Sequence, residues 1–170
     1  MAETTTVELK QLIGFTVGEE EYGLELLNVR EVIRMRQITW LPKAPACVKG
    51  IINLRGDVIP IIDLRERFGL ARGESTAMTR VIVVDLQGRP VGMVVDSASQ
   101  VVRVPADQFD EPPPVMGEAV SRFITSIGRI DDRLVILLDV EKMLSREDLQ
   151  ELDTSIKEAG EQHARRTGDN

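Results

Sequence analysis

The chain has 170 residues and a formal net charge of −7 at pH 7, with 42% hydrophobic and 29% charged residues. A chain of this size buries roughly 70% of its unfolded surface without disulfides or metals, and its acidic balance disfavours nucleic acid, because phosphate binding needs a basic face. The single cysteine excludes an intramolecular disulfide, and the sequence has neither a basic, apolar leader nor an apolar run of about 18 residues, which predicts a cytoplasmic protein with no direct membrane insertion.

The N-terminal segments predict short strands. Residues 11–17 form the first strand, Gly18 begins a turn, and residues 22–27 form the second strand. Residues 29–35 fit either a further strand or a short helix followed by a strand.

Glu31 is a charge inside an apolar frame made by Val29, Val32 and Ile33. A charge in this setting can select a partner of complementary charge at an apolar interface. It can equally pair with a nearby arginine such as Arg30 or Arg55. The two interpretations are compatible.

The segment 48–70 contains the longest apolar run of the chain, interrupted by Arg-Gly-Asp. Residues 49–54 predict a buried strand, and Gly56 supplies the positive φ of a tight turn with Arg55 at its tip. The return strand contains Pro60, which cannot donate a ladder hydrogen bond, so we expect an edge strand or a bulge at Pro60. An arginine at a hairpin tip is not needed for folding, and Arg55 is therefore the first candidate for a functional residue.

A short helix is predicted after this hairpin. Asp63 and Glu66 have the spacing of a capping box, which opens a helix over residues 64–68. Arg65 and Arg67 are expected to lie on its solvated face.

The C-terminus predicts a longer helix. Ser145 and Asp148 form a second capping box, and apolar residues follow at helical spacing, namely Leu149, Leu152, Ile156 and Ala159. The tail from Gly160 onward is expected to fray.

The sequence is duplicated. With an offset of 69 residues the pattern of 15–32 recurs at 84–101, and with an offset of 76 residues IPIIDL at 59–64 recurs as VILLDV at 135–140. A repeat of this length has a marginal core alone, so two repeats should pack together and share one core. Short strands at regular spacing favour small barrels. The predicted fold class is all-β with short helices and a C-terminal helix, built as two pseudo-duplicated five-stranded barrels.

Few residues are suited to catalysis. The only histidine, His163, lies in the C-terminal tail, and Cys47 has no histidine near it in the sequence, so we expect no catalytic residue, no cofactor and no metal. Cys47 is as compatible with filling the core as with solvent exposure. Most aspartates stand at turns or strand ends, where a short acceptor caps the backbone. Since the residues offer little for catalysis or metal binding, we expect a binding role.

Four stretches in the same order resemble a known family. They are FTVGEEEYGLELLNVREVI, GIINLRGDVIPIIDLRERFG, VIVVDLQGRPVGMVVDSASQVVRV and ITSIGRIDDRLVILLDVEKML. The chain resembles the CheW family, whose domain also occurs in CheA kinases and CheV proteins. The resemblance implies one domain over residues 12–152, made of two intertwined SH3-like barrels. Residues 1–11 are then a polar leader, and residues 153–170 the end of the C-terminal helix and a frayed tail.

The resemblance implies a non-enzymatic adaptor for chemotaxis. Such an adaptor couples the cytoplasmic tips of methyl-accepting chemotaxis receptors to the regulatory domain of the histidine kinase CheA, and it is recruited to receptor arrays at the membrane. An alternative is a CheW-like scaffold of a chemosensory pathway that does not control flagella. Carried over by position, the receptor-binding residues are Val29, Glu31, Gly50, Asn53, Arg55, Gly92 and Val101. The resemblance assigns no kinase-binding residues.

Overall fold

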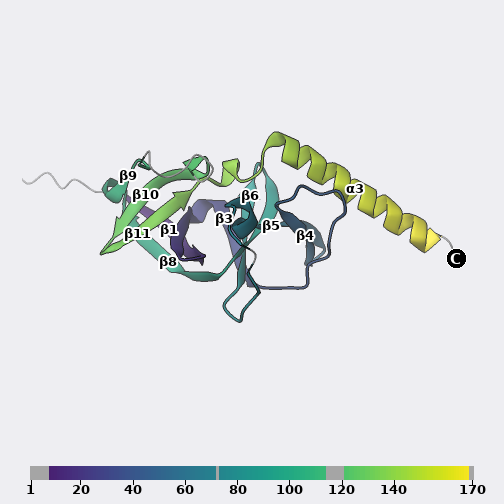
Figure 1. Ribbon diagram of the computed structural model, residues 1–170, viewed down its shortest axis with the longest axis horizontal. Helices are drawn as coiled ribbons and strands as arrows, with labels where there is room; N and C mark the ends of the chain where they lie inside the picture. Colours follow the sequence, from purple (N-terminus) through teal and green to yellow (C-terminus); the bar gives the residue numbers. More distant parts are fainter. Residues whose placement is uncertain (1–7, 72, 114–120, 169–170) are drawn as a thin grey trace, which may run out of the picture.

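The computed structural model describes residues 8–71, 73–113 and 121–168, so most of the predicted leader lies outside the described residues (Figure 1). Sheet A contains β1 (Leu9–Val17), β2 (Glu20–Glu25), β8 (Ser97–Pro105), β9 (Phe109–Asp110), β10 (Ile124–Ile130) and β11 (Arg133–Leu138). Sheet B contains β3 (Val29–Arg34), β4 (Val48–Leu54), β5 (Asp57–Asp63), β6 (Arg80–Leu86) and β7 (Arg89–Val95). The helices are α1 (Leu64–Arg67), α3 (Arg146–Gly168) and the short 3-10 turns η1 (Leu26–Asn28), η2 (Ala106–Gln108) and η3 (Val140–Lys142).

Each sheet takes strands from both halves of the chain. The strand order is β8-β1-β2-β11-β10-β9 in sheet A and β3-β6-β7-β5-β4 in sheet B. In the sequence duplication, strands β1 to β5 of the first half correspond, in order, to β6, β7, β8, β10 and β11 of the second half. When each strand of sheet A is replaced by its counterpart, the strand order of sheet B results; the two-residue β9 has no counterpart. The predicted fold class, two pseudo-duplicated five-stranded units in a mostly β protein, is confirmed.

One hydrophobic core joins the two sheets and the C-terminal helix. Phe15 and Tyr22 of sheet A stack at a centroid distance of 5.8 Å, and Tyr22 stacks on Phe68, which follows α1, at 5.2 Å. The same cluster contains Met93 of sheet B and Leu152 of α3, both fully buried. Two smaller buried clusters, one around Ile61 in sheet B and one around Leu12 in sheet A, also take residues from both halves of the chain. Neither half therefore has a core of its own, and the apolar burial that drives folding is shared between them.

The prediction of an edge strand or a bulge at Pro60 is wrong, because β5 lies between β7 and β4. Pro60 lies opposite Ile51 in the antiparallel pair with β4, and the parallel pair with β7 begins only at Ile61. In an antiparallel pair of strands, hydrogen-bonded and non-hydrogen-bonded residue pairs alternate. Leu54 and Asp57, which flank the two-residue turn, form a hydrogen-bonded pair, and Ile51 and Pro60 form the third pair after it. Pro60 thus falls on a non-hydrogen-bonded pair, where its missing N–H breaks no bond to β4.

The prediction of a solvated helix face at Arg65 and Arg67 is also wrong. The two side chains are only 28% and 23% exposed, and they bind the carboxylates of Asp96 and Asp148. The Arg67 guanidinium carbon also lies 5.0 Å from the centroid of the Phe123 ring. The four-residue α1 is enclosed by elements that lie far away in the sequence, which local spacing does not reveal.

The predicted capping box at the start of α3 is confirmed. The Asp148 N–H donates to Ser145 Oγ at 3.0 Å, and the Ser145 N–H donates to Asp148 Oδ2 at 3.1 Å. The expected fraying from Gly160 is not seen, since α3 continues to Gly168. The residues after Gly160 are mostly Glu, Gln, Ala and Arg, which favour helix strongly enough to carry it past one glycine.

Two glycines allow close packing within sheet B. A Cβ atom at Gly92 would lie 2.5 Å from Ile61 Cδ1 and 2.8 Å from Val81 Cγ1, both in neighbouring strands. A Cβ at Gly50 would lie 2.1 Å from the carbonyl oxygen of Thr39, whose backbone bridges the outer edge of β4. At both positions the close packing therefore requires glycine, because any larger residue would clash with its neighbours.

Replacing Gly92 by alanine should lower the free energy of unfolding by roughly 1–3 kcal/mol, because the added methyl overpacks a filled region. Urea denaturation followed by circular dichroism measures the change. Gly160→Ala is the matched control: no atom lies within 4 Å of its added Cβ, and alanine there should stabilise the helix by about 0.5–1 kcal/mol. An unchanged urea midpoint for Gly92→Ala would contradict the packing role.

Cys47 fills the core. It is 6% exposed, and burial raises the pKa of its thiol above the ordinary value, an effect that the nearby Arg67 guanidinium opposes. Of the two possibilities left open by the sequence, the structure shows the buried one.

The Cys47 thiol should react slowly with a disulfide reagent at pH 8. The thiolate is the reactive form, and a raised pKa lowers its fraction in the folded protein, while burial blocks access. We expect a rate about a hundredfold or more below that in concentrated urea, where the thiol regains its ordinary pKa. Equal rates in the two conditions would show that the thiol is accessible in the folded state.

Candidate functional site

The β4–β5 hairpin holds its tip in a defined turn. Arg55 and Gly56 both have positive φ, at 52° and 90°, as a two-residue type I′ turn requires. The sequence predicted a positive φ for Gly56, and the structure adds Arg55. The Gly56 N–H donates to Asn53 Oδ1 at 2.9 Å, which closes the turn from within. The same left-handed conformation occurs at Gln87 and Asp131, the first residues of the β6–β7 and β10–β11 turns, so it belongs to this turn type, and the exposed arginine is what distinguishes the β4–β5 tip.

Arg55 reaches from the hairpin tip to the edge strand β3. Its Nη2 donates to Glu31 Oε2 at 2.5 Å, across 24 positions of sequence, so the predicted pairing of Glu31 with a local arginine is confirmed for Arg55. The Arg55 side chain is 71% exposed, and a pair this exposed contributes at most about 1 kcal/mol. The ion pair therefore fixes where the guanidinium points more than it stabilises the fold.

A small hollow of about 80 Å³ lies beneath this ion pair. It is lined by Arg30, Glu31, Leu54, Arg55, Asp57, Ile59, Val83 and Pro90. Within the described part of the chain, Glu31 Oε1 and Asp85 Oδ1 are buried acceptors without a hydrogen-bond partner, although Asp85 Oδ2 lies 3.4 Å from Arg30 Nη2. Buried acceptors without donors are rare in folded proteins, so this cluster has unused capacity for hydrogen bonding.

Apolar side chains lie exposed on and beside the edge strands. Val32 of β3 and Val101 of β8 are 37% and 47% exposed, and they occupy matching positions of the two halves. Leu27, in the turn where the chain passes from β2 to β3, is 94% exposed. A leucine exposed this far beside an edge strand is a candidate contact residue, and the sequence did not indicate it because residues 22–27 were predicted to form a strand.

The structure brings together only part of the predicted receptor-binding set. Glu31, Asn53 and Arg55 meet at the hairpin tip, and Val29 lies two residues from Glu31 on β3, half-buried against the core. Gly92 lies in the middle strand β7 of sheet B, and Gly50 lies in the outermost strand β4, where each allows the close packing described above. Val101 belongs to sheet A and is not among the residues that line the hollow.

A second surface surrounds the only tryptophan. Trp40 is 74% exposed and lies at a hollow of about 450 Å³ lined mainly by residues 38–49 and by Glu66. Lys43 and Lys49 stand at this hollow, which otherwise has mostly apolar walls. The sequence reading missed this surface, although a lone tryptophan between polar residues and prolines was the signal that could have indicated it.

Among the described residues, no helix is both long and apolar enough to cross a membrane. In the same part of the chain, no three histidine, cysteine, aspartate or glutamate side chains group as metal ligands would.

Comparison with known proteins places the chain. The family model described as the CheW-like domain matches residues 11–148. A chemotaxis protein CheW from Klebsiella aerogenes is 37% identical over 151 residues, which cover 87% of this chain and 89% of the relative. One from Helicobacter pylori is 34% identical over 140 residues, covering 82% and 84%. Protein FrzA of Myxococcus xanthus is 31% identical over 134 residues, covering 76% and 82%.

A solved structure has the same fold. The scaffolding protein TtCheW from Thermoanaerobacter tengcongensis superposes with a TM-score of 0.76 at 33% sequence identity, over 83% of this chain and 96% of that one. The match spans both sheets and nearly the full length of the relatives, and with the family model it leads to one conclusion: the chain belongs to the CheW family.

Proposed function

We propose that the protein is a non-enzymatic adaptor that couples the cytoplasmic tips of methyl-accepting chemotaxis receptors to the histidine kinase CheA. It acts in the cytoplasm and is recruited to receptor arrays at the membrane. Membership of a family whose relatives are named chemotaxis and scaffolding proteins supports this proposal. The observation that carries it is the hairpin tip, where a tight turn presents an arginine that is 71% exposed and held in place by Glu31.

The tip is suited to a receptor helix that carries a carboxylate. Within the described residues Arg55 has Glu31 as its polar partner, through Nη2 alone, so most of its N–H donors are available to a second acceptor. Glu31 holds the guanidinium in place before binding, which reduces the entropy lost on docking. The exposed Leu27 and Val32 would supply apolar contact beside the charge, while the charge selects the partner.

The kinase needs a different surface from the receptor, because an adaptor binds both at once. The hollow at Trp40 is the best candidate, since exposed tryptophans are frequent hot spots of protein interfaces. Trp40 is next to Thr39, which bridges β4 at Ile51, whereas Arg55 is at the tip beyond the end of β4. Both partners could therefore bind sheet B without competing.

A scaffold of a chemosensory pathway that does not control flagella is the second candidate. The similarity to Protein FrzA, a relative that is not named a chemotaxis protein, supports this second candidate. Deleting the gene separates the two: loss of swimming chemotaxis supports the first, and loss of surface motility with normal swimming supports the second.

Arg55→Ala should weaken receptor binding about tenfold while leaving the fold nearly intact. Alanine at this position has the same left-handed strain as arginine, so the turn energy changes little and the measured loss reports on the side chain. The measurements are the affinity for a receptor-tip fragment and the activity of CheA reconstituted with receptor membranes.

Arg129→Ala is the matched control, because Arg129 is an exposed, ion-paired arginine on the corresponding β10–β11 hairpin. It should leave receptor binding unchanged. If Arg55→Ala binds receptor as the wild type does, or if it unfolds the protein, the assignment of Arg55 to recognition fails. If the wild-type protein binds neither receptor tip nor kinase, the adaptor function itself fails.

A further inference from the structure

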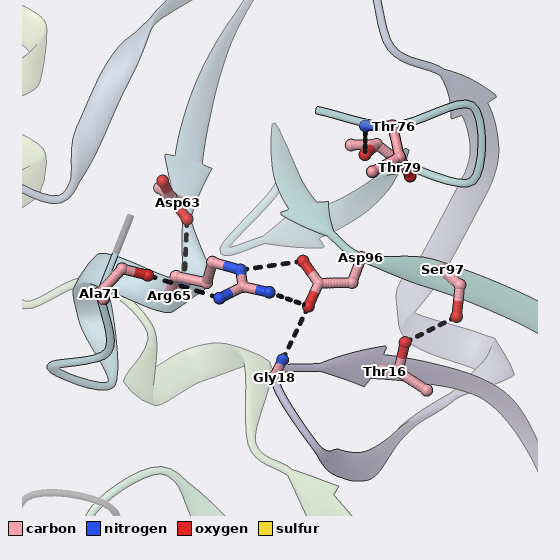
Figure 2. A network of polar contacts seen from close by, with 9 residues as sticks. All are labelled: Thr16, Gly18, Asp63, Arg65, Ala71, Thr76, Thr79, Asp96 and Ser97. Atoms are coloured by element: carbon pink, nitrogen blue, oxygen red, sulfur yellow. Dashed lines mark hydrogen bonds and ion pairs between the residues drawn. The ribbon is translucent and has the colours of Figure 1, made fainter. Parts of the chain in front are cut away.

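A bidentate ion pair lies where the chain passes from one sheet to the other (Figure 2). Arg65 Nε donates to Asp96 Oδ1 at 3.0 Å, and Arg65 Nη2 donates to Asp96 Oδ2 at 2.5 Å. The Gly18 N–H donates to the same Oδ2 at 2.7 Å. The two charged side chains are only 28% and 31% exposed, and the hydrogen bond to Asp96 is the main cause that raises the pKa of Arg65.

The three residues belong to three different parts of the fold. Arg65 is in α1, directly after β5 of sheet B, and Gly18 is in the β1–β2 turn of sheet A. Asp96 is the single residue between β7 of sheet B and β8 of sheet A. The parallel pairing of β5 with β7 sets Asp63 opposite Val94, so the chain two residues further on brings Arg65 to Asp96. Asp96 therefore binds sheet B through Arg65 and sheet A through Gly18, at the residue where the chain passes between the two sheets.

Further contacts fix this junction. Thr16 and Ser97 share a hydroxyl hydrogen bond of 2.6 Å, and the Asp96 N–H donates to the Thr16 carbonyl at 2.9 Å. The backbone at Gly73 covers the guanidinium so closely that a Cβ there would lie 3.0 Å from Arg65 Cζ. Partial exclusion of water strengthens a charged hydrogen bond, so this pair is held more firmly than an exposed surface pair.

Among the described residues, the other crossing, at Leu27, has no equivalent ion pair. In the duplicated register, Leu27 stands where Asp96 stands and Glu141 stands where Arg65 stands. Leu27 is apolar and 94% exposed, so it cannot bind a charged side chain in this way. The duplication alone therefore does not account for the Arg65–Asp96 pair.

We infer that Arg65 and Asp96 are positioning residues for receptor binding, because they hold the β8 edge strand in a fixed orientation to the β4–β5 hairpin. Asp96 is five residues before Val101, the exposed valine of β8, and Arg65 follows the hairpin that presents Arg55. Together with the shared core, the pair fixes the position of Val101 in sheet A relative to Arg55 in sheet B, and both residues belong to the predicted receptor-binding set. This inference rests on the proposed receptor binding.

Asp96→Asn tests the inference. Asparagine keeps the acceptor for the Gly18 N–H and removes the charge that binds Arg65. In full-length protein with Cys47→Ala, spin labels at Val58→Cys and Leu134→Cys report the distance between the sheets by pulsed EPR, because these residues are exposed in β5 and β11. We expect a shifted or broader distance distribution and, in unlabelled protein, receptor-tip binding weakened about threefold or more.

Asp110→Asn is the matched control, since the Arg129–Asp110 pair joins two strands of the same sheet. It should change neither the distance distribution nor the affinity. If Asp96→Asn proves unfolded by circular dichroism, Arg65→Lys takes its place, because lysine keeps the charge and loses the bidentate contact.

The outcomes separate the inference from the proposed function. If Arg55→Ala weakens binding and Asp96→Asn leaves it unchanged, the positioning role is overturned and the receptor assignment stands. An unaltered distance distribution in Asp96→Asn overturns it as well. If neither Arg55→Ala nor Asp96→Asn affects binding, the receptor surface itself is misassigned.

Discussion

The exchange of strands between the two halves of the chain is the constraint on which the rest of this structure depends. Sheet A needs β8, β10 and β11 to complete β1 and β2, and sheet B needs β3, β4 and β5 to complete β6 and β7. The chain must therefore cross between the sheets, once at η1 and once at Asp96. Two parallel strand pairs, β2 with β11 and β5 with β7, join the halves inside the sheets, and one core fills the space between them.

The chain crosses between the sheets at two equivalent positions, but one crossing carries a charged residue and the other an apolar one. At Asp96 the chain is tied by charged hydrogen bonds to α1 and to the β1–β2 turn, whereas at Leu27 it exposes an apolar side chain. A crossing that is held rigidly can transmit the position of one sheet to the other, and a crossing that exposes leucine is available to a partner. Duplication thus supplied two equivalent positions, and the differences between them indicate separate uses.

Patterns in the sequence predicted the strands, turns and helix caps, but they did not predict which elements pack against one another. The hairpin at Arg55 and the capping box at Ser145 follow from residue types at short spacing, and the duplication follows from comparing the two halves of the chain. For Glu31 the sequence offered Arg30 or Arg55 as a partner, and the structure shows Arg55. The errors at Pro60 and Arg65 have one cause. Both depend on the parallel pairing of β5 with β7, which joins residues about 30 positions apart and leaves no periodic signal.

The candidate site was predictable to the same extent and for the same reason. Arg55 was identified because a charged tip between apolar strands has no folding role, which is a local argument. Gly92 and Gly50 were included by resemblance alone, and the structure gives both a packing role inside sheet B, so any influence on a partner must pass through the strands around them. Leu27 and Trp40 were missed because exposure is a property of the assembled fold.

The hairpin tip contributes little to the stability of the fold. A left-handed arginine costs about 1–2 kcal/mol and its exposed ion pair returns at most about 1 kcal/mol, so the arrangement is near neutral or slightly unfavourable for stability. Within the part of the chain that the structure describes, the same arrangement leaves a buried oxygen of Glu31 without a donor. A tip that is strained, fixed in direction and incompletely hydrogen-bonded gains more from a partner than a relaxed turn would, because the partner supplies the missing contacts without first having to order the arginine.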